Sequence, residues 1–202
     1  MGSLPVSVLD RRPIVVALAG PNGAGKTTFY HAHLRSAGLR LVNADVLARE
    51  LKMDPYAAAR VAGAIREELI RQRESFVLET VFSDPVGDEL GFLRTAAEAE
   101  YTVLLCFIGI SGPEVSEERV AMRVLQGGHD VPQEKLTARF AENAETLGIL
   151  ENLRRAMREV PHVWVFDNDD LRRPFRLVAV CEGGKVVRVE EPIPGWLRGV
   201  LP

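Results

Sequence analysis

Cysteine and aromatic residues are scarce in this sequence, which has two cysteines among 202 residues and an aromatic content of 6%. Cys106 and Cys181 both lie in apolar runs, without the CxxC or Cys/His spacing of a metal site, so we expect reduced, buried and unreactive thiols. His31 and His33 are two positions apart and do not share a helix face, so no histidine metal site is expected. This composition argues against a disulfide-stapled protein and against a zinc protein.

Long hydrophobic runs and a strong charge of one sign are also missing. No apolar stretch approaches the roughly 20 residues that span a bilayer, and the start MGSLPVSVLDRRP has no apolar signal core. The net charge is −3 and basic residues are interspersed with acidic ones. We therefore expect a cytoplasmic protein with neither a nucleic-acid nor a membrane partner.

A phosphate-binding loop is the strongest motif that the sequence does contain. Residues 20–27 read GPNGAGKT, which matches G-x-x-x-x-G-K-[ST], and they follow the apolar run Ile14 to Ala19. Glycines let successive backbone N–H groups face a phosphate, Lys26 reaches the β- and γ-phosphates, and Thr27 offers its hydroxyl to Mg²⁺. Glycines that only made a turn would not explain Lys26 and Thr27 at their required offsets. The residues expected to bind nucleotide here are Gly20, Pro21, Asn22, Gly23, Ala24, Gly25, Lys26, Thr27 and Thr28.

Strand-like and helix-like segments alternate along the chain, which predicts an α/β fold with a parallel sheet flanked by helices. The expected strands are Ile14 to Ala19, Leu39 to Val42, Phe76 to Thr80, Thr102 to Ile108 and Val163 to Phe166. The expected helices are Lys26 to Ser36, Ala57 to Arg71, Val86 to Glu98, Pro113 to Leu125 and Gln133 to Arg158. The last has an apolar face at helical spacing, formed by Leu136, Phe140, Leu147, Leu150, Leu153 and Met157.

The pattern changes near residue 175. Leu177 to Cys181 and Lys185 to Val189 flank Gly183-Gly184, which predicts a β-hairpin, and we expect it as an appended ribbon. The length predicts one domain over residues 1–202, with a core at about 14–168 and the hairpin at about 175–190.

Polar residues gather where the expected strands end, and ligands of open α/β sheets bind at that edge. Asn43 and Asp45 follow the second strand, and Glu79 and Thr80 end the third. Asp45 has an alternative interpretation as the N-cap of a short helix, and Glu79 as a solvated strand end. Asn168 follows Asp167 at the end of the fifth strand and is a further candidate nucleotide-binding residue.

Arg119 and Arg123 lie four residues apart on one face of an expected helix, and neither has an acidic residue three or four positions upstream. Like charges at this spacing repel, so a phosphate is a plausible partner. A solvated basic face is the alternative. Gly127-Gly128 and Pro132 around His129 would let this segment act as a lid. Arg139 is weaker evidence, because Glu142 follows at i+3.

Five motifs together resemble the zeta-toxin-like kinases, and more closely the short bacterial branch labelled predicted ABC-type ATPase. They are GPNGAGKTT at Gly20 to Thr28, NAD at Asn43 to Asp45, ET at Glu79-Thr80, the arginine and GGHDVP stretch at Arg119 to Pro132, and DN at Asp167-Asn168. They occur in order over most of the chain.

The resemblance implies a P-loop kinase that uses ATP or GTP with Mg²⁺ to phosphorylate the sugar of UDP-N-acetylglucosamine or a related nucleotide sugar. Asp45 matches the base that orients the sugar hydroxyl. Glu79, with Thr80 beside it, matches the glutamate that contacts the sugar nucleotide. Arg119 or Arg123 matches the lid arginine that neutralises the transferred phosphoryl group. An antitoxin protein is a possible partner.

The sequence departs from the larger toxins in the lid, where they have an arginine just ahead of Thr-Pro and this chain has His129. A neutral histidine stabilises phosphoryl charge less than arginine does, so Arg139 or the second member of the arginine pair is the candidate for the missing charge. By this resemblance we expect Asn43, His129 and Arg139 to bind the substrate.

Other functions remain open at this point. The absence of an LSGGQ-type signature argues against a transporter ATPase. A different small-molecule or nucleoside kinase shares the Asp after the second strand. A non-catalytic nucleotide-binding module would instead use the Arg119 and Arg123 face to dock a protein.

Overall fold

The described part of the chain forms one mixed sheet with helices on both faces. The computed structural model describes residues 6–83, 88–112 and 144–202, and within them the sheet has seven strands in the order β2-β3-β1-β4-β5-β6-β7. The strands are β1 (Ile14–Ala19), β2 (Arg40–Val42), β3 (Phe76–Thr80), β4 (Thr102–Gly109), β5 (His162–Asp167), β6 (Arg176–Glu182) and β7 (Lys185–Val189). The helices are α1 (Lys26–Phe29), α2 (Ala44–Leu51), α3 (Pro55–Arg71), α4 (Asp88–Glu98) and α7 (Ala144–Glu159), with short helical turns η1 (Val6–Val8), η2 (Tyr30–Leu34), η3 (Arg35–Ala37) and η4 (Gly195–Leu197).

The first five strands of the chain run parallel. β1 lies at the centre between β3 and β4, β2 pairs with β3, and β5 pairs with β4, all in parallel register. Strands β4 and β5 are almost wholly buried, as is typical of parallel strands covered on both faces. The structure confirms the predicted α/β class, with a mostly parallel sheet flanked by helices.

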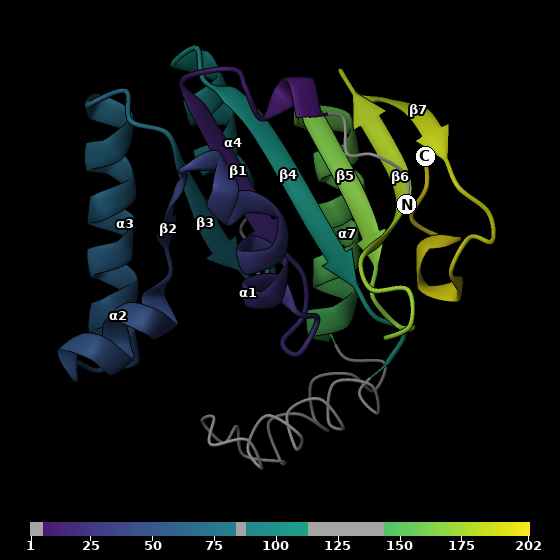
Figure 1. Cartoon of the computed structure of the whole chain (residues 1–202), viewed down its shortest axis with the longest axis horizontal. Coiled ribbons are helices and arrows are strands. Elements are labelled where there is room, and N and C mark those ends of the chain that lie inside the picture. The colour runs from purple at the N-terminus through teal and green to yellow at the C-terminus, as the bar shows by residue number, and fades with distance from the viewer. Residues whose placement is uncertain (1–5, 84–87, 113–143) are drawn as a thin grey trace.

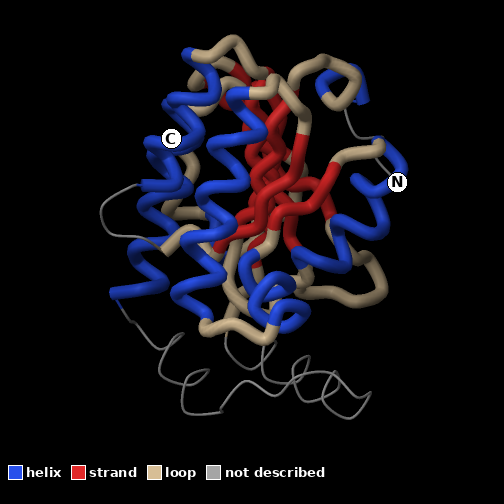
Figure 2. The backbone as a smooth tube through the Cα atoms, turned by 90° about the vertical axis from the view of Figure 1, so that its left-hand side faces the viewer, coloured by secondary structure: helices blue, strands red, loops and turns tan. Residues whose placement is uncertain are grey.

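Alternate residues of each strand supply two separate hydrophobic cores, because successive side chains point to opposite faces of a sheet. Val15 and Ala17 of β1 pack with residues of α3, α4 and α7. Val16 and Leu18 pack on the other face, with Phe29 of α1. Figure 2 shows the sheet between these two groups of helices. β1 is therefore packed on both faces up to the point where the chain leaves the sheet.

The predicted C-terminal hairpin is present, but its expected position as an appended ribbon is wrong. β6 pairs antiparallel with β5, and β7 pairs antiparallel with β6, so the hairpin continues the main sheet at one edge (Figure 1). The reason lies in β6 itself. Ala179 and Cys181 pack into one core and Val180 into the other, and a strand that is apolar on both faces has to be covered on both.

Helix positions agree with the predictions within a few residues, with two differences. The segment after the phosphate loop is helical from Lys26 to Ala37, but it changes from α1 to the π-helical turn η2 and then to the 3₁₀ turn η3. The expected helix Pro113 to Leu125 and residues 133–143 of the expected last helix lie outside the described residues. In α7, Leu153 and Met157 are buried as predicted. None of the helices in the described ranges has the length and apolar character needed to cross a membrane.

Candidate active site

The carboxyl ends of the parallel strands meet at one edge of the sheet, and the phosphate loop begins there. β1 ends at Ala19, opposite Thr80 of β3 on one side and Phe107 of β4 on the other. Residues 20–25 then connect β1 to α1 (Figure 1). The structure thus brings the loop close to the polar ends of the neighbouring strands, as the sequence predicts for a ligand site.

Lys26 is folded back over its own loop. Its Nζ donates hydrogen bonds to the carbonyl oxygens of Gly20 at 2.8 Å and Pro21 at 3.1 Å, and the residue is 5% exposed. Burial lowers the pKa of Lys26, and the negative charges of Glu79 and Asp45 partly offset that effect. Lys26 therefore places a buried amino group at the phosphate loop, 4.0 Å from the carboxylate of Glu79.

Glu79 links three parts of the site. Its Oε2 accepts hydrogen bonds from the Thr27 hydroxyl at 3.2 Å and from Asn43 Nδ2 at 2.8 Å. Its Oε1 lies 4.0 Å from Lys26 Nζ. Since the Glu79 side chain is 14% exposed, the alternative interpretation as a solvated strand end is wrong. Glu79 instead faces the phosphate loop, with its charge next to both motif residues.

Asn43 is the N-cap of α2, so the alternative interpretation of Asp45 as the cap is wrong. Asn43 Oδ1 accepts hydrogen bonds from the backbone N–H groups of Asp45 at 2.8 Å and Val46 at 3.1 Å. Asn and Asp cap helices about equally well. Asn43 directly follows β2 and precedes the first helical residue, so it is the residue at the N-cap position. Asp45 is left in the first turn of α2 with an exposed side chain, and its charge reaches Lys26.

Thr80 is turned toward the protein. Its hydroxyl donates to Glu89 Oε1 of α4 at 2.8 Å and accepts from the backbone N–H of Phe82 at 2.9 Å, and the residue is 9% exposed. Phe82 is fully buried and has a φ of 66°. Thr80 therefore stabilises the strained turn after β3, a role that the sequence did not indicate because Glu89 lies nine residues away.

Asn168 contacts the phosphate loop from the other side of β1. Its Nδ2 donates to the carbonyl oxygen of Ala24 at 2.8 Å, and its Oδ1 accepts from the N–H of Phe175 at 3.2 Å. Asn168 is 4% exposed. The sequence did not point to Phe175, which ends the loop that follows Asn168.

A family model matches residues 15–145, which is well over half of the chain and includes the phosphate loop, β1 to β4 and the residues of the Glu79 network. It is the AAA_33 model, described as an AAA domain. The chain belongs to this family.

One protein is similar to this chain in sequence, and two solved structures are similar to it in fold. An uncharacterized protein of Haemophilus influenzae is 26% identical over 126 residues, covering 60% of this chain and 88% of that protein. AvrRxo1-ORF1 in complex with AvrRxo1-ORF2 and sulphate ions has a TM-score of 0.62 at 19% identity, over 93% of this chain and 64% of that chain. A structure from the PezAT toxin-antitoxin system of Streptococcus pneumoniae has a TM-score of 0.59 at 14% identity, over 95% of this chain and 78% of that chain.

These structural likenesses show a shared fold. AvrRxo1-ORF1:-ORF2 has also been crystallised with ATP, and that structure has a TM-score of 0.61 at 19% identity. This chain spans 64% of the length of the AvrRxo1 chain that it matches.

Four predicted site residues of this AAA domain lie outside the described residues: Arg119, Arg123, His129 and Arg139. The structure brings together Lys26, Thr27, Asn43 and Glu79 through the contacts above, with Asp45 acting on Lys26 through its charge. Gly20, Pro21, Asn22, Gly23, Ala24 and Gly25 form the loop itself, and Thr28 is exposed in α1.

The oxygen atoms beside the phosphate loop fit Mg²⁺. Thr27 presents a hydroxyl and Glu79 a carboxylate, 3.2 Å apart, and oxygen is the ligand that Mg²⁺ prefers. Among the described residues there is no group of three His, Cys, Asp or Glu side chains that would form an all-protein metal site. A nucleotide-bound Mg²⁺ is usually held by one or two protein groups together with phosphates.

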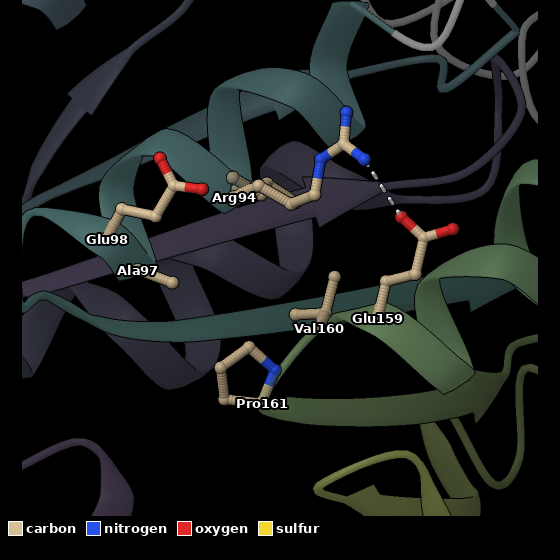
Figure 3. A pocket seen from close by; sticks show the side chains of 7 residues that line it. Arg94, Ala97, Glu98, Glu159, Val160 and Pro161 are labelled. Atoms are coloured by element: carbon tan, nitrogen blue, oxygen red, sulfur yellow. Dashed lines mark ion pairs between the residues drawn. The ribbon is translucent and has the colours of Figure 1, made fainter.

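A small pocket of about 170 Å³ lies away from this site (Figure 3). It is lined by Leu93, Arg94, Ala97, Glu98, Glu159, Val160 and Pro161. Arg94 and Glu159 form an ion pair of 3.7 Å across it. Glu98 ends α4 just before β4, and Pro161 directly precedes β5, so the pocket is at the amino ends of the strands, opposite the phosphate loop.

Proposed function

We propose that this AAA domain is an ATP- or GTP-dependent phosphotransferase that phosphorylates the sugar hydroxyl of UDP-N-acetylglucosamine or a related nucleotide sugar. The observation that carries the proposal is the cluster of Lys26, Thr27 and Glu79 at the phosphate loop, with the charge of Asp45 close enough to act on Lys26. The zeta-toxin resemblance of the sequence supports the nucleotide-sugar acceptor. Two proteins that share the fold support a nucleotide-dependent, toxin-like function: AvrRxo1, which has been crystallised with ATP, and a protein of the toxin-antitoxin system PezAT.

Phosphoryl transfer requires positioning and positive charge around the γ-phosphoryl oxygens. Lys26 holds the buried cation, and in the nucleotide complex we expect its Nζ to exchange the Gly20 and Pro21 carbonyls for phosphate oxygens. Backbone N–H groups of the loop bind the other phosphate oxygens. Thr27, with Glu79 beside it, would hold Mg²⁺, which when bound adds positive charge at the phosphates.

The acceptor hydroxyl needs a group that orients it and takes its proton, and Asp45 is that group in our proposal. Its carboxylate is exposed, and Asn43 already caps the helix, so the helix does not need Asp45 as its cap. Asn43, Glu79, His129 and Arg139 are the proposed acceptor-binding residues. Thr80, which was expected to bind the substrate as well, instead shapes the turn after β3.

Arg119 and Arg123 are proposed to neutralise the transferred phosphoryl group. Arginine contacts of this kind contribute on the order of 10³ to 10⁵ in rate in related enzymes. We also propose a protein partner of the antitoxin type, because the PezAT neighbour belongs to a toxin-antitoxin system.

The test is mass spectrometry of a pool of nucleotide sugars, including UDP-N-acetylglucosamine, after incubation with the protein, Mg²⁺ and ATP or GTP. We expect one product heavier by one phosphoryl group. Asp45→Asn should abolish this product while the nucleotide still binds, because the substitution removes the base and keeps the loop and the helix cap. Near-normal transfer by Asp45→Asn would show that Asp45 is not the base.

Lys26→Met is the matched control for the nucleotide site, because methionine keeps most of the buried stem and lacks the ammonium group. It should weaken nucleotide binding by about 10- to 100-fold, as expected for the loss of a charged hydrogen bond. Transfer to a nucleoside or another small molecule would identify a different kinase. Nucleotide binding without transfer to any acceptor would identify a non-catalytic module.

A further inference from the structure

Asn168 is fixed in the fold before its side chain reaches the phosphate loop. It directly follows β5, and its backbone N–H donates to the carbonyl oxygen of Gly109, the last residue of β4, at 3.0 Å. The preceding residue, Asp167, accepts hydrogen bonds from Arg176 at 3.2 Å and from the indole N–H of Trp196 at 3.1 Å. The position of the Asn168 backbone is therefore fixed by its hydrogen bond to β4 and by the contacts of the preceding residue, Asp167.

The two ends of the Asn168 amide are both engaged with backbone groups. Nδ2 donates to Ala24 of the phosphate loop at 2.8 Å, and Oδ1 accepts from Phe175 at 3.2 Å. The Phe175 ring lies against Phe29 of the helix after the loop, with ring centroids 5.2 Å apart. Asn168 is thus linked directly to the phosphate loop at Ala24 and, through Phe175, to the helix that follows the loop. The Asn168 amide points toward these protein groups.

The contact to Ala24 sets the direction of a loop amide. A peptide group is planar and trans, so the Ala24 carbonyl and the Gly25 N–H point in opposite directions. When Asn168 holds that carbonyl, the Gly25 N–H has to point away from Asn168. Gly25 has a φ of 94°, and a Cβ on it would lie 2.8 Å from Asn168 Nδ2 and 3.3 Å from the Phe175 ring. The packing leaves this peptide little freedom to rotate.

We infer that Asn168 is a positioning residue, which holds the Ala24–Gly25 peptide in the orientation that phosphate binding requires. This inference rests on the proposed nucleotide binding at residues 20–28 and goes beyond it. It differs from direct recognition of the nucleobase, because a residue that shapes the loop affects every phosphate ligand equally. Without the Nδ2 donor, the ligand itself would have to restore the peptide orientation, and its affinity would fall.

The experiment compares the affinity of wild-type protein and Asn168→Asp for ATP, GTP and inorganic tripolyphosphate, each with Mg²⁺, by titration calorimetry. Aspartate has the same shape as asparagine but places an oxygen where the Nδ2 donor was. We expect the dissociation constants of all three ligands to rise by the same factor, about tenfold, as for one lost buried hydrogen bond. Asn168→Ala, which also lacks the donor, should show the same pattern and serves if Asn168→Asp does not fold.

Asn152→Asp is the matched control. Asn152 is also a buried asparagine, 5% exposed, and its Nδ2 donates to a backbone carbonyl, that of Phe82, at 3.1 Å. This control should lower the melting temperature and leave tripolyphosphate affinity unchanged, which separates loop positioning from a general loss of stability.

Three results would overturn the inference. The first is unchanged affinity of the Asn168 variants for all three ligands, and the second is a loss for ATP or GTP without a loss for tripolyphosphate. In both cases the proposed function stands. The third is wild-type protein that binds none of the ligands, in which case the proposed function fails together with the inference.

Discussion

At the scale of single residues, Asn43 has two structural roles that can be measured separately. Its Oδ1 caps α2 through the N–H groups of Asp45 and Val46, and its Nδ2 donates to Glu79 at 2.8 Å. The cap contributes to stability, whereas the Glu79 contact belongs to the candidate active site. Serine retains a cap oxygen but has no amide, so the two roles separate in a pair of variants.

We expect Asn43→Ala to lower the free energy of unfolding by about 0.5–2 kcal/mol through loss of the cap, which corresponds to a fall of several degrees in melting temperature. Asn43→Ser should keep most of that stability. Both variants should reduce phosphotransfer alike, because both lack the donor to Glu79. Thermal unfolding and transfer rates of the two proteins check this, and a serine variant as unstable as the alanine variant would contradict the assignment of the cap.

At the scale of elements, the end of β4 is in close contact with the C-terminal turn η4. Gly109 ends β4, and the Trp196 ring of η4 occupies the space where a side chain at Gly109 would lie, 2.2 Å from an ideal Cβ. The indole N–H of Trp196 also donates to Asp167 at 3.1 Å, and its ring lies 5.9 Å from that of Phe107. This contact joins the C-terminal segment to the strand end that precedes Asn168.

We expect Gly109→Ala to destabilise the protein by about 1–3 kcal/mol, because the added methyl group has to displace the ring. In a Trp196→Ala background the same substitution should cost little, since the clash is gone, and the resulting double-mutant cycle measures the contact. Gly112→Ala is the control, because a Cβ there meets no atom within 4 Å among the described residues beyond its chain neighbours. Melting temperatures of the four proteins and the control provide the test. Equal costs in both backgrounds would contradict the assigned contact.

The elements that could be predicted are those whose signals are local. Strands β1 and β3 have the predicted bounds because each is an apolar run that ends at polar residues or at the glycine of the loop. The position of the hairpin was not predictable in the same way. Its strands have local signals, whereas the pairing of β6 with β5 depends on which edge of the sheet the chain returns to.

The same distinction applies to the candidate site. Lys26 and Thr27 follow from a motif with fixed spacing, and the contact of Glu79 with them follows from a parallel sheet that places β3 next to β1. The Asn168 contact with Ala24 joins residues 144 positions apart. Such a contact has no local signal, so Asn168 could be predicted from the sequence only as a candidate nucleotide-binding residue, without the group that it contacts.

At the scale of the whole molecule, the amino ends of the parallel strands lie opposite the phosphate loop, and His162 begins β5 at that end. Its Nδ1 is buried and has no hydrogen-bond partner within the described ranges. Burial lowers the pKa of His162 from its ordinary value of 6.5, the charge of Arg11 lowers it further, and Glu182 acts in the opposite direction. Burial also lowers the pKa of His33.

These shifts predict that the protein loses stability as the pH falls below about 6.5. In that range the unfolded chain binds a proton at His162, whereas the folded protein does not bind it until the pH is lower. Because the unfolded state then holds more protons, the free energy of unfolding rises with pH and falls as the solution is acidified. The contribution is fully present above pH 6.5 and is lost as the pH decreases toward the lowered pKa of the folded state.

Melting temperatures measured between pH 7.5 and 5 in wild type and His162→Asn test this expectation. The variant should show a smaller decrease over that range, because asparagine does not titrate and can occupy much of the same space. His31→Asn, at an exposed histidine, is the control and should follow the wild-type curve. If His162→Asn also follows the wild-type curve, His162 is not the group that links pH to unfolding, and His33→Asn becomes the variant that has to show the smaller decrease.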